Sequence, residues 1–341
     1  MAALGVVAFV ATTGFTSGGA TPSWQLSVTG VTARFRGLAP VSDKVAWVAG
    51  SAGTILRTLD GGKSWASVGP AAAAALQFRD IEAVDAQHAV ALTIGEGEDS
   101  RIYTTSDGGT TWAETFRNEE PTAFYDCITF LDKRHGLALS DPVDGKFRIL
   151  ATADGGRSWA VRSSKGMPAA LTGEFAFAAS GTCLVSAGGR AYFATGGGAS
   201  ARVFSSTNGG RSWSVTDTPI PSGPSAGIYS LAFRDPEHGI AVGGDYAVPD
   251  AAPDGSATTR DGRTWTVSAT VPGEYRSGAA WVDQRTALAV GPTGSDISRD
   301  GGTSWTGFDT GSFDAVACVG HGACWASGEQ GRVAVLNWGR G

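Results

Sequence analysis

Short apolar segments separated by turn residues run along almost the whole chain. Seven of them begin with an aromatic or large aliphatic residue, at 35–38, 78–81, 124–127, 175–177, 228–231, 275–278 and 313–316. A short turn and a small apolar segment follow, as in 45–49, 88–92 and 238–242. Segments of this length, bounded by Gly, Asp and Ser, are typical of β-strands. The pattern therefore predicts an all-β chain built from repeated strand pairs.

A second repeated feature is the motif Asp-Gly-Gly-x-Ser/Thr-Trp, which occurs six times, with Asn in the fourth copy and one Gly fewer in the fifth. Its end residues are Asp60 and Trp65, Asp107 and Trp112, Asp154 and Trp159, Asn208 and Trp213, Asp261 and Trp265, and Asp300 and Trp305. Gly-Gly supplies the positive φ angles of a tight hairpin, and Asp accepts hydrogen bonds from the backbone of the turn. The Trp ring packs against the hairpin and the next sheet. These residues are predicted to be structural corners, not catalytic groups.

The two patterns combine into a unit of four strands, with the Asp motif between the third and the fourth. The seventh unit, residues 313–338, has only three strands, and the missing strand is available in 23–28. The span from Ser23 to Trp338 gives about 45 residues per unit, within the range of propeller blades. We therefore predict, over residues 21–341, an all-β fold: a single seven-bladed β-propeller of four-stranded antiparallel blades, with the last blade closed by the N-terminal strand.

The six motifs resemble the Asp box of the bacterial neuraminidase repeat (BNR) superfamily of β-propellers, and the resemblance covers nearly all of the chain after residue 20. The single propeller and the Asp-Gly-Gly-Lys-Ser-Trp sequence of residues 60–65 are most similar to photosystem II stability and assembly factor-like proteins. This resemblance implies a propeller with an Arg-lined surface that holds a partner protein. It is specific for the fold and much less so for an activity, because one fold hosts many functions.

Composition and charge narrow the function classes. The 341 residues include 50 Gly and 11 Trp, and the net charge is −6. Because no basic run is present, a surface that binds nucleic acid is not expected. The apolar stretch at the start is too short to span a bilayer and is interpreted as a signal peptide over residues 1–20. We therefore expect a secreted or periplasmic monomer without a transmembrane segment.

The four cysteines are too few for a disulfide scaffold. Cys318 and Cys324 flank a predicted hairpin turn and could form a disulfide in an oxidising compartment. Cys127 and Cys183 are predicted to lie in buried strands, where packing as small apolar residues is expected.

Candidate binding residues gather on the face opposite the Asp motifs. The loops between the second and third strands are long in four consecutive units, at 95–100, 140–146, 188–198 and 244–255. Long loops on a rigid scaffold are where binding sites usually lie. The nearby mouth of the channel should hold the first residues of the inner strands and three loop residues. The predicted ligand-binding residues are Arg36, Arg79, Asp80, Tyr125, Asp126, Asp141, Tyr229, Asp245, Tyr246 and Arg276, and Glu174 and Asp314 belong to the same rim.

Two enzyme hypotheses use the same mouth. Sialidases of the resembled superfamily hold a substrate carboxylate with three Arg and use a Tyr nucleophile with a Glu. Arg36, Arg79 and Arg276, with Tyr275 or Tyr229 and Glu174, offer these residue types, although the motif expected in the first blade is only loosely matched at 35–40. A paired-carboxylate hydrolase or lyase could instead use Asp126 with Asp141 or Asp245. Pairing of Arg and Asp within the mouth is the structural alternative to both.

Metal and cofactor chemistry has little support in the sequence. His88, His135, His238 and His321 fall at the same repeat position, so they are spread around the ring and cannot converge on one zinc ion. Calcium could bind the acidic loop with Glu96, Glu98 and Asp99, but no EF-hand spacing is present. The Gly-rich run 195–198 lacks the βαβ frame of a dinucleotide site. We therefore expect no cofactor and no metal, and favour a non-catalytic propeller that binds a protein segment or a carbohydrate over a hydrolase or lyase.

Overall fold

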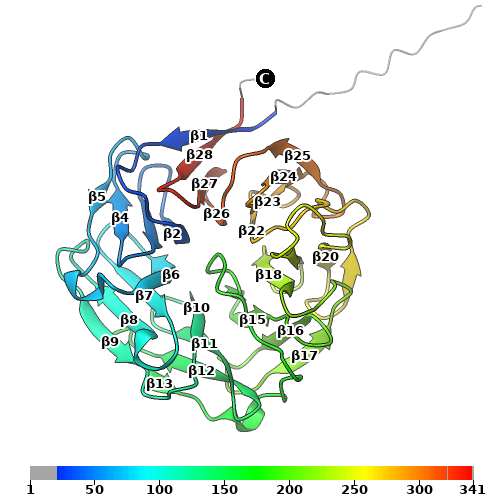
Figure 1. Cartoon of the computed structure of the whole chain (residues 1–341), viewed down its shortest axis with the longest axis horizontal. Helices are drawn as coiled ribbons and strands as arrows, with labels where there is room; N and C mark the ends of the chain where they lie inside the picture. The colour runs from blue at the N-terminus through cyan, green and yellow to red at the C-terminus, as the bar shows by residue number, and fades with distance from the viewer. Residues whose placement is uncertain (1–20, 321, 340–341) are drawn as a thin grey trace, which may run out of the picture.

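A computed structural model describes residues 21–320 and 322–339 of the chain. In these residues the chain forms seven antiparallel four-stranded sheets arranged as the blades of one ring (Figure 1). Blade 1 contains β2 (Phe35–Pro40), β3 (Ala46–Gly50), β4 (Ile55–Thr58) and β5 (Ala66–Ser67). Blade 2 contains β6 (Gln77–Ala83), β7 (Ala89–Ile94), β8 (Arg101–Thr105) and β9 (Ala113–Arg117). Blade 3 contains β10 (Tyr125–Phe130), β11 (Gly136–Val143), β12 (Lys146–Thr152) and β13 (Ala160–Val161).

The remaining blades repeat this order. Blade 4 contains β14 (Leu184–Ala187), β15 (Arg190–Ala194), β16 (Arg202–Ser206) and β17 (Ser214–Asp217). Blade 5 contains β18 (Ala226–Phe233), β19 (Gly239–Asp245), β20 (Ser256–Thr259) and β21 (Trp265–Val267). Blade 6 contains β22 (Gly278–Trp281), β23 (Ala287–Gly291), β24 (Gly294–Ser298) and β25 (Thr306–Asp309). Blade 7 contains β26 (Ala315–Val319), β27 (Ala323–Ser327), β28 (Val333–Asn337) and β1 (Ser23–Ser27), and three short 3₁₀ turns lie at Ala71–Ala73, Gly97–Asp99 and Ser164–Gly166.

The ring closes as the sequence predicts, because β1 pairs with β28 as the outer strand of blade 7. Five residue pairs align antiparallel, from Ser23 opposite Asn337 to Ser27 opposite Val333. Trp24 also reaches blade 6, where its indole N–H donates to Ser295 Oγ at 3.0 Å. The predicted seven-bladed fold is confirmed. The N-terminal strand thus completes blade 7 and also contacts blade 6.

The six Asp motifs form the predicted hairpin turns, which we call the Asp turns. In the third copy, Asp154 accepts hydrogen bonds from the backbone N–H of Ser158 at 3.0 Å and from its hydroxyl at 2.6 Å. The Thr152 hydroxyl donates to the same carboxylate at 2.8 Å. In the second copy, the Trp112 indole donates to the Val68 carbonyl of blade 1 at 2.6 Å, so the motif also ties neighbouring blades together. The Asp turns are therefore structural elements of the ring.

Replacing the Asp of an Asp turn should destabilise the fold in a pH-dependent way. Hydrogen bonds to Ser158 and Thr152 hold the Asp154 pKa at about 2, below the usual ~3.9 of an unfolded chain. The stabilisation is therefore present above about pH 4 and is lost as the pH falls through about 2. We expect Asp154→Ala to lower the melting temperature by about 2 °C at pH 7, since a net hydrogen bond contributes about 1 kcal/mol.

Asp154→Asn is the matched control for this prediction, because the fourth Asp turn naturally carries Asn208 and retains its hydrogen bonds to Ser212. Thermal melts between pH 2 and pH 7 should show a smaller loss for Asn than for Ala at pH 7. The advantage of wild type over Asp154→Asn should shrink in acid. A gap that stays constant over this range would contradict the assigned role of the carboxylate.

Three local predictions are wrong. The inner strand of blade 4 is β14, not the segment 175–177, which the pattern of aromatic residues suggested. The predicted loop 188–198 contains the turn between β14 and β15 as well as all of β15, and the loop between β15 and β16 is only 195–201. The predicted loop 140–146 is mostly an extension of β11 and β12, which pair up to Val143 and Lys146. Long loops remain at 95–100 and at 246–255.

The cysteine predictions have mixed outcomes. Cys318 and Cys324 are opposite each other on β26 and β27 and form a disulfide, as the sequence suggested. Cys127 and Cys183 do not act as separate packing residues, because they also form a disulfide, with Cα atoms 6.1 Å apart. No free cysteine is left in the described part of the chain. The disulfide between Cys127 and Cys183 connects β10 of blade 3 to the residue before β14 of blade 4.

Candidate binding surface at the channel mouth

Several of the predicted site residues occupy one structural position, at the start of an inner strand. The pairing of the first two strands shifts by one residue at this point in blades 1, 2, 3 and 5. The extra residues in these bulges are Arg36, Arg79, Asp126 and Tyr229. A bulge redirects a side chain at the rim of a sheet. The four positions are therefore equivalent in the repeat.

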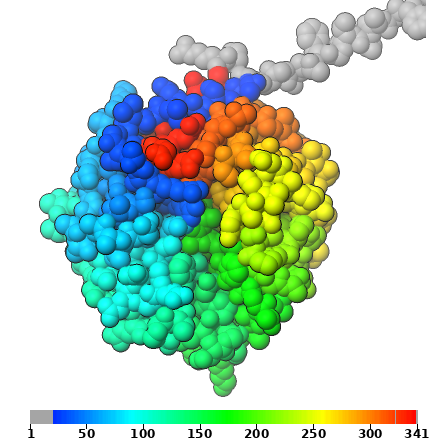
Figure 2. All heavy atoms as spheres, in the orientation of Figure 1, coloured from blue at the N-terminus to red at the C-terminus, as the bar shows by residue number. Residues whose placement is uncertain are grey.

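The channel is crossed by residues 175–182, which we call the channel segment. Blade 3 lies between blades 2 and 4, yet Arg79 of blade 2 donates to the carbonyl of Ala178 at 2.9 Å. An added Cβ at Gly181 would lie only 2.5 Å from Asp80 Oδ1 of blade 2. Figure 1 shows this green part of the chain reaching into the centre of the ring, and Figure 2 shows the blades following one another around the ring. The segment therefore fills the channel from blade 4.

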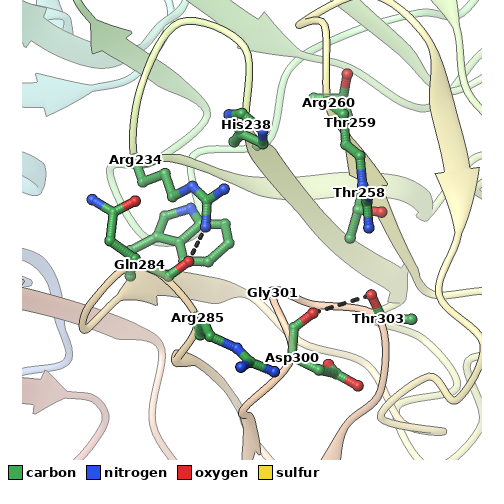
Figure 3. A pocket seen from close by; sticks show the side chains of 12 residues that line it. Arg234, His238, Thr258, Thr259, Arg260, Gln284, Arg285, Asp300, Gly301 and Thr303 are labelled. Atoms are coloured by element: carbon green, nitrogen blue, oxygen red, sulfur yellow. Dashed lines mark hydrogen bonds between the residues drawn. The ribbon is translucent and has the colours of Figure 1, made fainter.

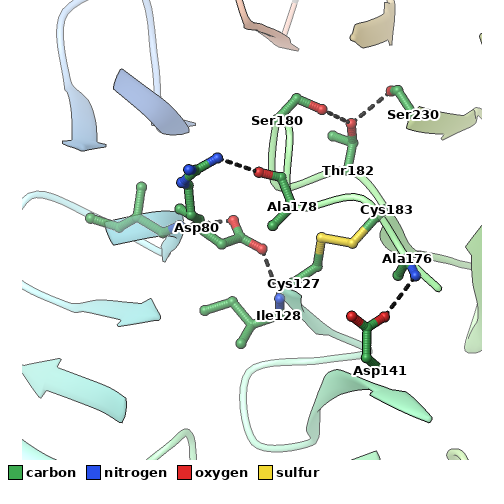
Figure 4. Close-up of a disulfide and its surroundings, with 12 residues drawn as sticks. Asp80, Cys127, Ile128, Asp141, Ala176, Ala178, Ser180, Thr182, Cys183 and Ser230 are labelled. Carbon is green, nitrogen blue, oxygen red and sulfur yellow. Dashed lines mark hydrogen bonds between the residues drawn. A yellow bond between two sulfur atoms is a disulfide. The ribbon is translucent and has the colours of Figure 1, made fainter. Parts of the chain in front are cut away.

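Blades 3 and 5 hold the channel segment from its other sides (Figure 4). The backbone N–H of Ala176 donates to Asp141 Oδ1 at 2.8 Å. The Thr182 hydroxyl lies 2.6 Å from Ser230 Oγ of blade 5. The disulfide to Cys127 follows directly after Thr182. The segment is thus fixed to three blades besides its own, and the sequence analysis missed it.

The channel segment contributes Phe177 to a group of three aromatic side chains, which we call the aromatic floor. The rings of Phe177 and Tyr229 stack with centroids 3.8 Å apart, and Tyr275 packs edge-on against Tyr229 at 4.7 Å. These three side chains are buried, whereas Tyr246 on the long loop of blade 5 is 57% exposed. Burial raises the pKa of both Tyr229 and Tyr275 above the usual range of a tyrosine. Both hydroxyls are therefore protonated at neutral pH, and neither is an ionised nucleophile.

A group of charged residues lies at the junction of blades 7 and 1. Arg34 donates two hydrogen bonds to Asp314, at 2.7 and 2.6 Å. Arg36 lies further from the same carboxylate, with Nε 3.6 Å from Oδ1, and this Nε has no hydrogen-bond partner. Burial lowers the pKa of Arg36 from its usual value, and the nearby Asp314 only partly offsets this effect. Arg36 is therefore a guanidinium that the protein leaves underpaired.

Three of the predicted carboxylates lie within the fold. Asp80 accepts hydrogen bonds from the N–H groups of Ile81 at 2.8 Å and Ile128 at 2.7 Å. Burial raises the pKa of Asp126, and the neighbouring Asp141 raises it further. Burial also raises the pKa of Asp141, to about 7. Because Asp126 is only 1% exposed and Asp141 binds the channel segment, a paired-carboxylate reaction has no open site between them.

The residues of the sialidase-like hypothesis are also engaged elsewhere. The Arg276 guanidinium binds Asp296 at 2.6 Å and Glu274 at 3.2 Å. Glu174 forms a buried ion pair with Arg202. Arg79 is bound to the channel segment, so the three Arg residues do not share one free pocket.

The other two predicted positions differ from each other in exposure. Tyr125 packs in the core beneath the mouth, where its ring meets Phe116 with centroids 5.4 Å apart. Asp245 accepts a hydrogen bond from the N–H of Ala247 at 2.8 Å and is partly exposed at the start of the long loop of blade 5. Of the predicted residues, Arg36, Asp245 and Tyr246 thus remain open to a partner.

The three histidines in the described part of the chain act as turn residues, as expected. Nδ1 of His88, His135 and His238 lies within 3.1 Å of the Asp three residues earlier in each turn. His321 lies outside the described residues, and so does the predicted signal peptide at 1–20. Within 21–320 and 322–339 no three His, Cys, Asp or Glu side chains form a metal-binding group, and no helix has the length and apolarity to span a membrane.

These features define a seven-bladed β-propeller with a filled channel and a rim of aromatic and Arg side chains. No protein-family model matches the chain, and no curated protein matches its sequence. Among solved structures, it is similar to YCF48 bound to D1 peptide, with a TM-score of 0.65, 13% identity, and coverage of 92% of this chain and 96% of that one. YCF48 from Cyanidioschyzon merolae has a TM-score of 0.64 and 15% identity, and the coverage is 92% of this chain and 98% of that chain.

The WD40 propeller domain of Doa1 is also similar, with a TM-score of 0.59, 13% identity, and coverage of 93% of this chain and 98% of that domain. At these identities the likeness shows the shared fold.

Proposed function

We propose that this propeller binds a segment of another protein across its channel mouth and has no catalytic role. The observation that carries the proposal is the underpaired Arg36 guanidinium beside an aromatic floor. An arginine in this setting gains most from a carboxylate, which it can bind through two parallel hydrogen bonds. The exposed ring of Tyr246 supplies a second contact of the kind that is enriched in protein interfaces.

The filled channel supports the same proposal. Because residues 175–182 cross the channel, a partner meets a surface and not a deep cavity. The ion pairs of Glu174 and Arg276 and the burial of Asp126 leave that surface without an open acid and base pair. Of the similar folds, YCF48 has been solved with a D1 peptide, which is a precedent for peptide binding on this architecture. The carbohydrate partner expected from the sequence stays a prediction.

We also propose that the chain is a propeller of the BNR superfamily and that it is exported from the cytoplasm. The hydrogen bonds of the Asp turns are what an Asp-box propeller needs, which supports placing the chain in that superfamily. Disulfides persist in oxidising compartments, so the two bonds in the described part of the chain support a secreted or periplasmic location. Expression with and without residues 1–20, followed by cell fractionation, tests the location: equal retention inside the cell would contradict it.

Selection of peptides on the purified protein tests the binding function. A random peptide library with free C-termini is selected on wild type, and the dissociation constant of each enriched peptide is measured by fluorescence anisotropy. We expect peptides with an acidic residue or a required C-terminal carboxylate. Arg36→Ala should weaken them at least tenfold, because a charge-assisted hydrogen bond contributes about 1.5 kcal/mol or more. Tyr246→Ala should weaken them less.

Arg157→Ala is the control variant, because Arg157 is an exposed arginine in the Asp turn of blade 3, on the other face. Its peptide affinity should equal that of wild type. Peptides that bind Arg36→Ala as tightly as wild type would exclude the channel mouth as the binding surface. A library that yields no enriched peptide would count against the whole proposal.

A further inference from the structure

A second polar site lies on the opposite face, where the Asp turns are. It is a cavity of about 230 Å³ between blades 5 and 6, and its lining includes Arg234, Arg260 and Arg285 (Figure 3). These three residues come from separate turns, before β19, after β20 and before β23. The cavity is smaller than the ~300–1,000 Å³ typical of sites for drug-sized ligands. Its size therefore suits a single charged group and not a whole large ligand.

The arginines of this cavity differ in how they are held. The Arg234 guanidinium lies over the Trp281 ring, 5.0 Å from its centroid, and donates to the Gln284 carbonyl. Its Nε has no hydrogen-bond partner. Among the described residues, neither Arg260 nor Arg285 makes a side-chain hydrogen bond or an ion pair, and both are exposed. One fixed and two adjustable guanidinium groups therefore face the same space.

The acidic residues near the cavity are already satisfied. Both Asp300 oxygens accept hydrogen bonds within their own Asp turn, from Ser298 at 2.9 Å and from the Ser304 hydroxyl at 2.5 Å. Asp235 accepts from His238 at 2.9 Å and lies 3.5 Å from Arg234 Nε. The lining of the cavity contains three Arg and one Asp, so its local charge is positive, although the net charge of the chain is −6. This local excess is what an anionic ligand would neutralise.

Comparison between blades shows that the arginines are a local departure from the repeat. The backbone N–H of Arg234 bonds to the carbonyl four residues later, and so do those of Val41, Val84, Leu131 and Val282 in blades 1, 2, 3 and 6. Arg234 thus replaces an apolar residue at an equivalent position. The residue before the Asp of the Asp turn is Leu59, Ser106, Ala153 and Thr207 in blades 1 to 4, and Arg260 and Arg299 in blades 5 and 6. Among the five blades in which this backbone N–H bonds to the carbonyl four residues later, only blade 5 has Arg both at that position and before the Asp of the Asp turn.

We propose that the cavity between blades 5 and 6 binds a phosphate or sulfate monoester group. Guanidinium groups bind tetrahedral oxyanions through paired hydrogen bonds, and Arg is favoured over Lys wherever such recognition is needed. The hydroxyl of Thr258, which also lines the cavity, can donate to one of the remaining oxygens. The site is independent of the channel mouth, which lies on the other face. Its ligand can therefore be present whether or not a protein segment binds there.

Isothermal titration of the purified chain tests this site with inorganic phosphate, phosphoserine and glucosamine 6-sulfate as probes. Wild type should bind at least one of them, and the affinity should fall as the salt concentration rises. The key variant is Arg234→Val with Arg260→Ser, because blade 2 carries Val84 and Ser106 at these positions and folds normally. We expect this double variant to weaken binding at least tenfold. A preference for phosphoserine or for the sulfated sugar identifies the natural class of monoester.

Arg134→Ala is the control, because Arg134 is the exposed equivalent of Arg285 in blade 3. Its affinity for the three probes should match wild type, and the melting temperatures of all variants should agree within about 2 °C. Absence of binding to every probe in wild type overturns the proposal. Equal binding by wild type and the double variant overturns it as well, because the anion would then lie elsewhere.

Discussion

Removal of the disulfide between blades 3 and 4 is expected to cost the fold about 4 kcal/mol, by the loop-entropy estimate for cysteines 56 residues apart. For a domain of this size such a loss lowers the melting temperature by about 6 °C. The double variant Cys127→Ala with Cys183→Ala makes this change. Amide hydrogen exchange should also rise in residues 175–182, because the disulfide follows directly after this segment. Thermal melts and exchange measured by mass spectrometry check the two effects.

The second disulfide is the matched control. Cys318 and Cys324 are only six residues apart, so the same estimate gives about 2 kcal/mol for Cys318→Ala with Cys324→Ala. Exchange in the channel segment should remain at the wild-type level in this variant. A larger loss of stability from removing the short-loop disulfide than from removing the long-loop one would contradict the loop-entropy estimate. Unchanged exchange at 175–182 without Cys127 and Cys183 would show that hydrogen bonds alone hold the segment.

The parts of the fold that local chemistry determines could be predicted from the sequence. An Asp turn needs only residues within a few positions of each other, such as Thr152, Asp154 and Ser158. The closing strand could be predicted as well, because the seventh unit lacks one strand and the first residues supply it. Repetition made both predictions stronger, since each copy tests the interpretation of the others. Fold class therefore followed from turn chemistry and spacing.

Blade 4 shows why an aromatic-led segment can mislead. Phe175 and Phe177 match the pattern of the other inner strands, but they pack beside Tyr229 in the channel. The true hairpin was available in the sequence, because two apolar segments flank Gly188–Gly189, a combination typical of a β-hairpin. The shift in strand assignment also concealed the disulfide. Cys183 lies just before the inner strand, directly beside blade 3, and not within a strand of its own.

Whether a predicted site residue is free or already paired depends on partners that are distant in the sequence. Arg34 and Asp314 are 280 residues apart, and Arg79 meets Ala178 across the channel. Sequence spacing could place Arg36, Arg79 and Arg276 on one rim, but it could not show which of them already had a partner. Only the folded structure distinguishes the underpaired Arg36 from Arg276, which two carboxylates hold. The structure thus leaves only a few of the predicted rim residues free to contact a partner.

Loss of the closing strand should have the largest effect on the ring. A chain that begins at Thr29 lacks β1, and so loses the five residue pairs with β28 and the contacts of Trp24 with Phe313 and Ser295. Truncation of a fully buried Trp costs about 3–5 kcal/mol, and loss of the partly buried Trp24 contributes a share of that in addition to the lost strand pairing. We expect the melting temperature to fall by about 8 °C or more, as measured by circular dichroism. The exposed edge of β28 should also make the shortened protein self-associate, which size-exclusion chromatography would detect.

A chain that begins at Thr21 is the control, because it retains all of β1 (Ser23–Ser27) and should melt at the temperature of the whole chain. Trp24→Ala separates the two contributions of the strand, since it removes the ring contacts but leaves the backbone pairing with β28 in place. Its melting temperature should lie between those of the two truncated chains. A synthetic peptide of residues 21–28 added to the shortened protein should restore part of the loss, because the vacant edge of β28 is its binding site. If the chain beginning at Thr29 melts within about 2 °C of the control and stays monomeric, the N-terminal strand does not close the ring.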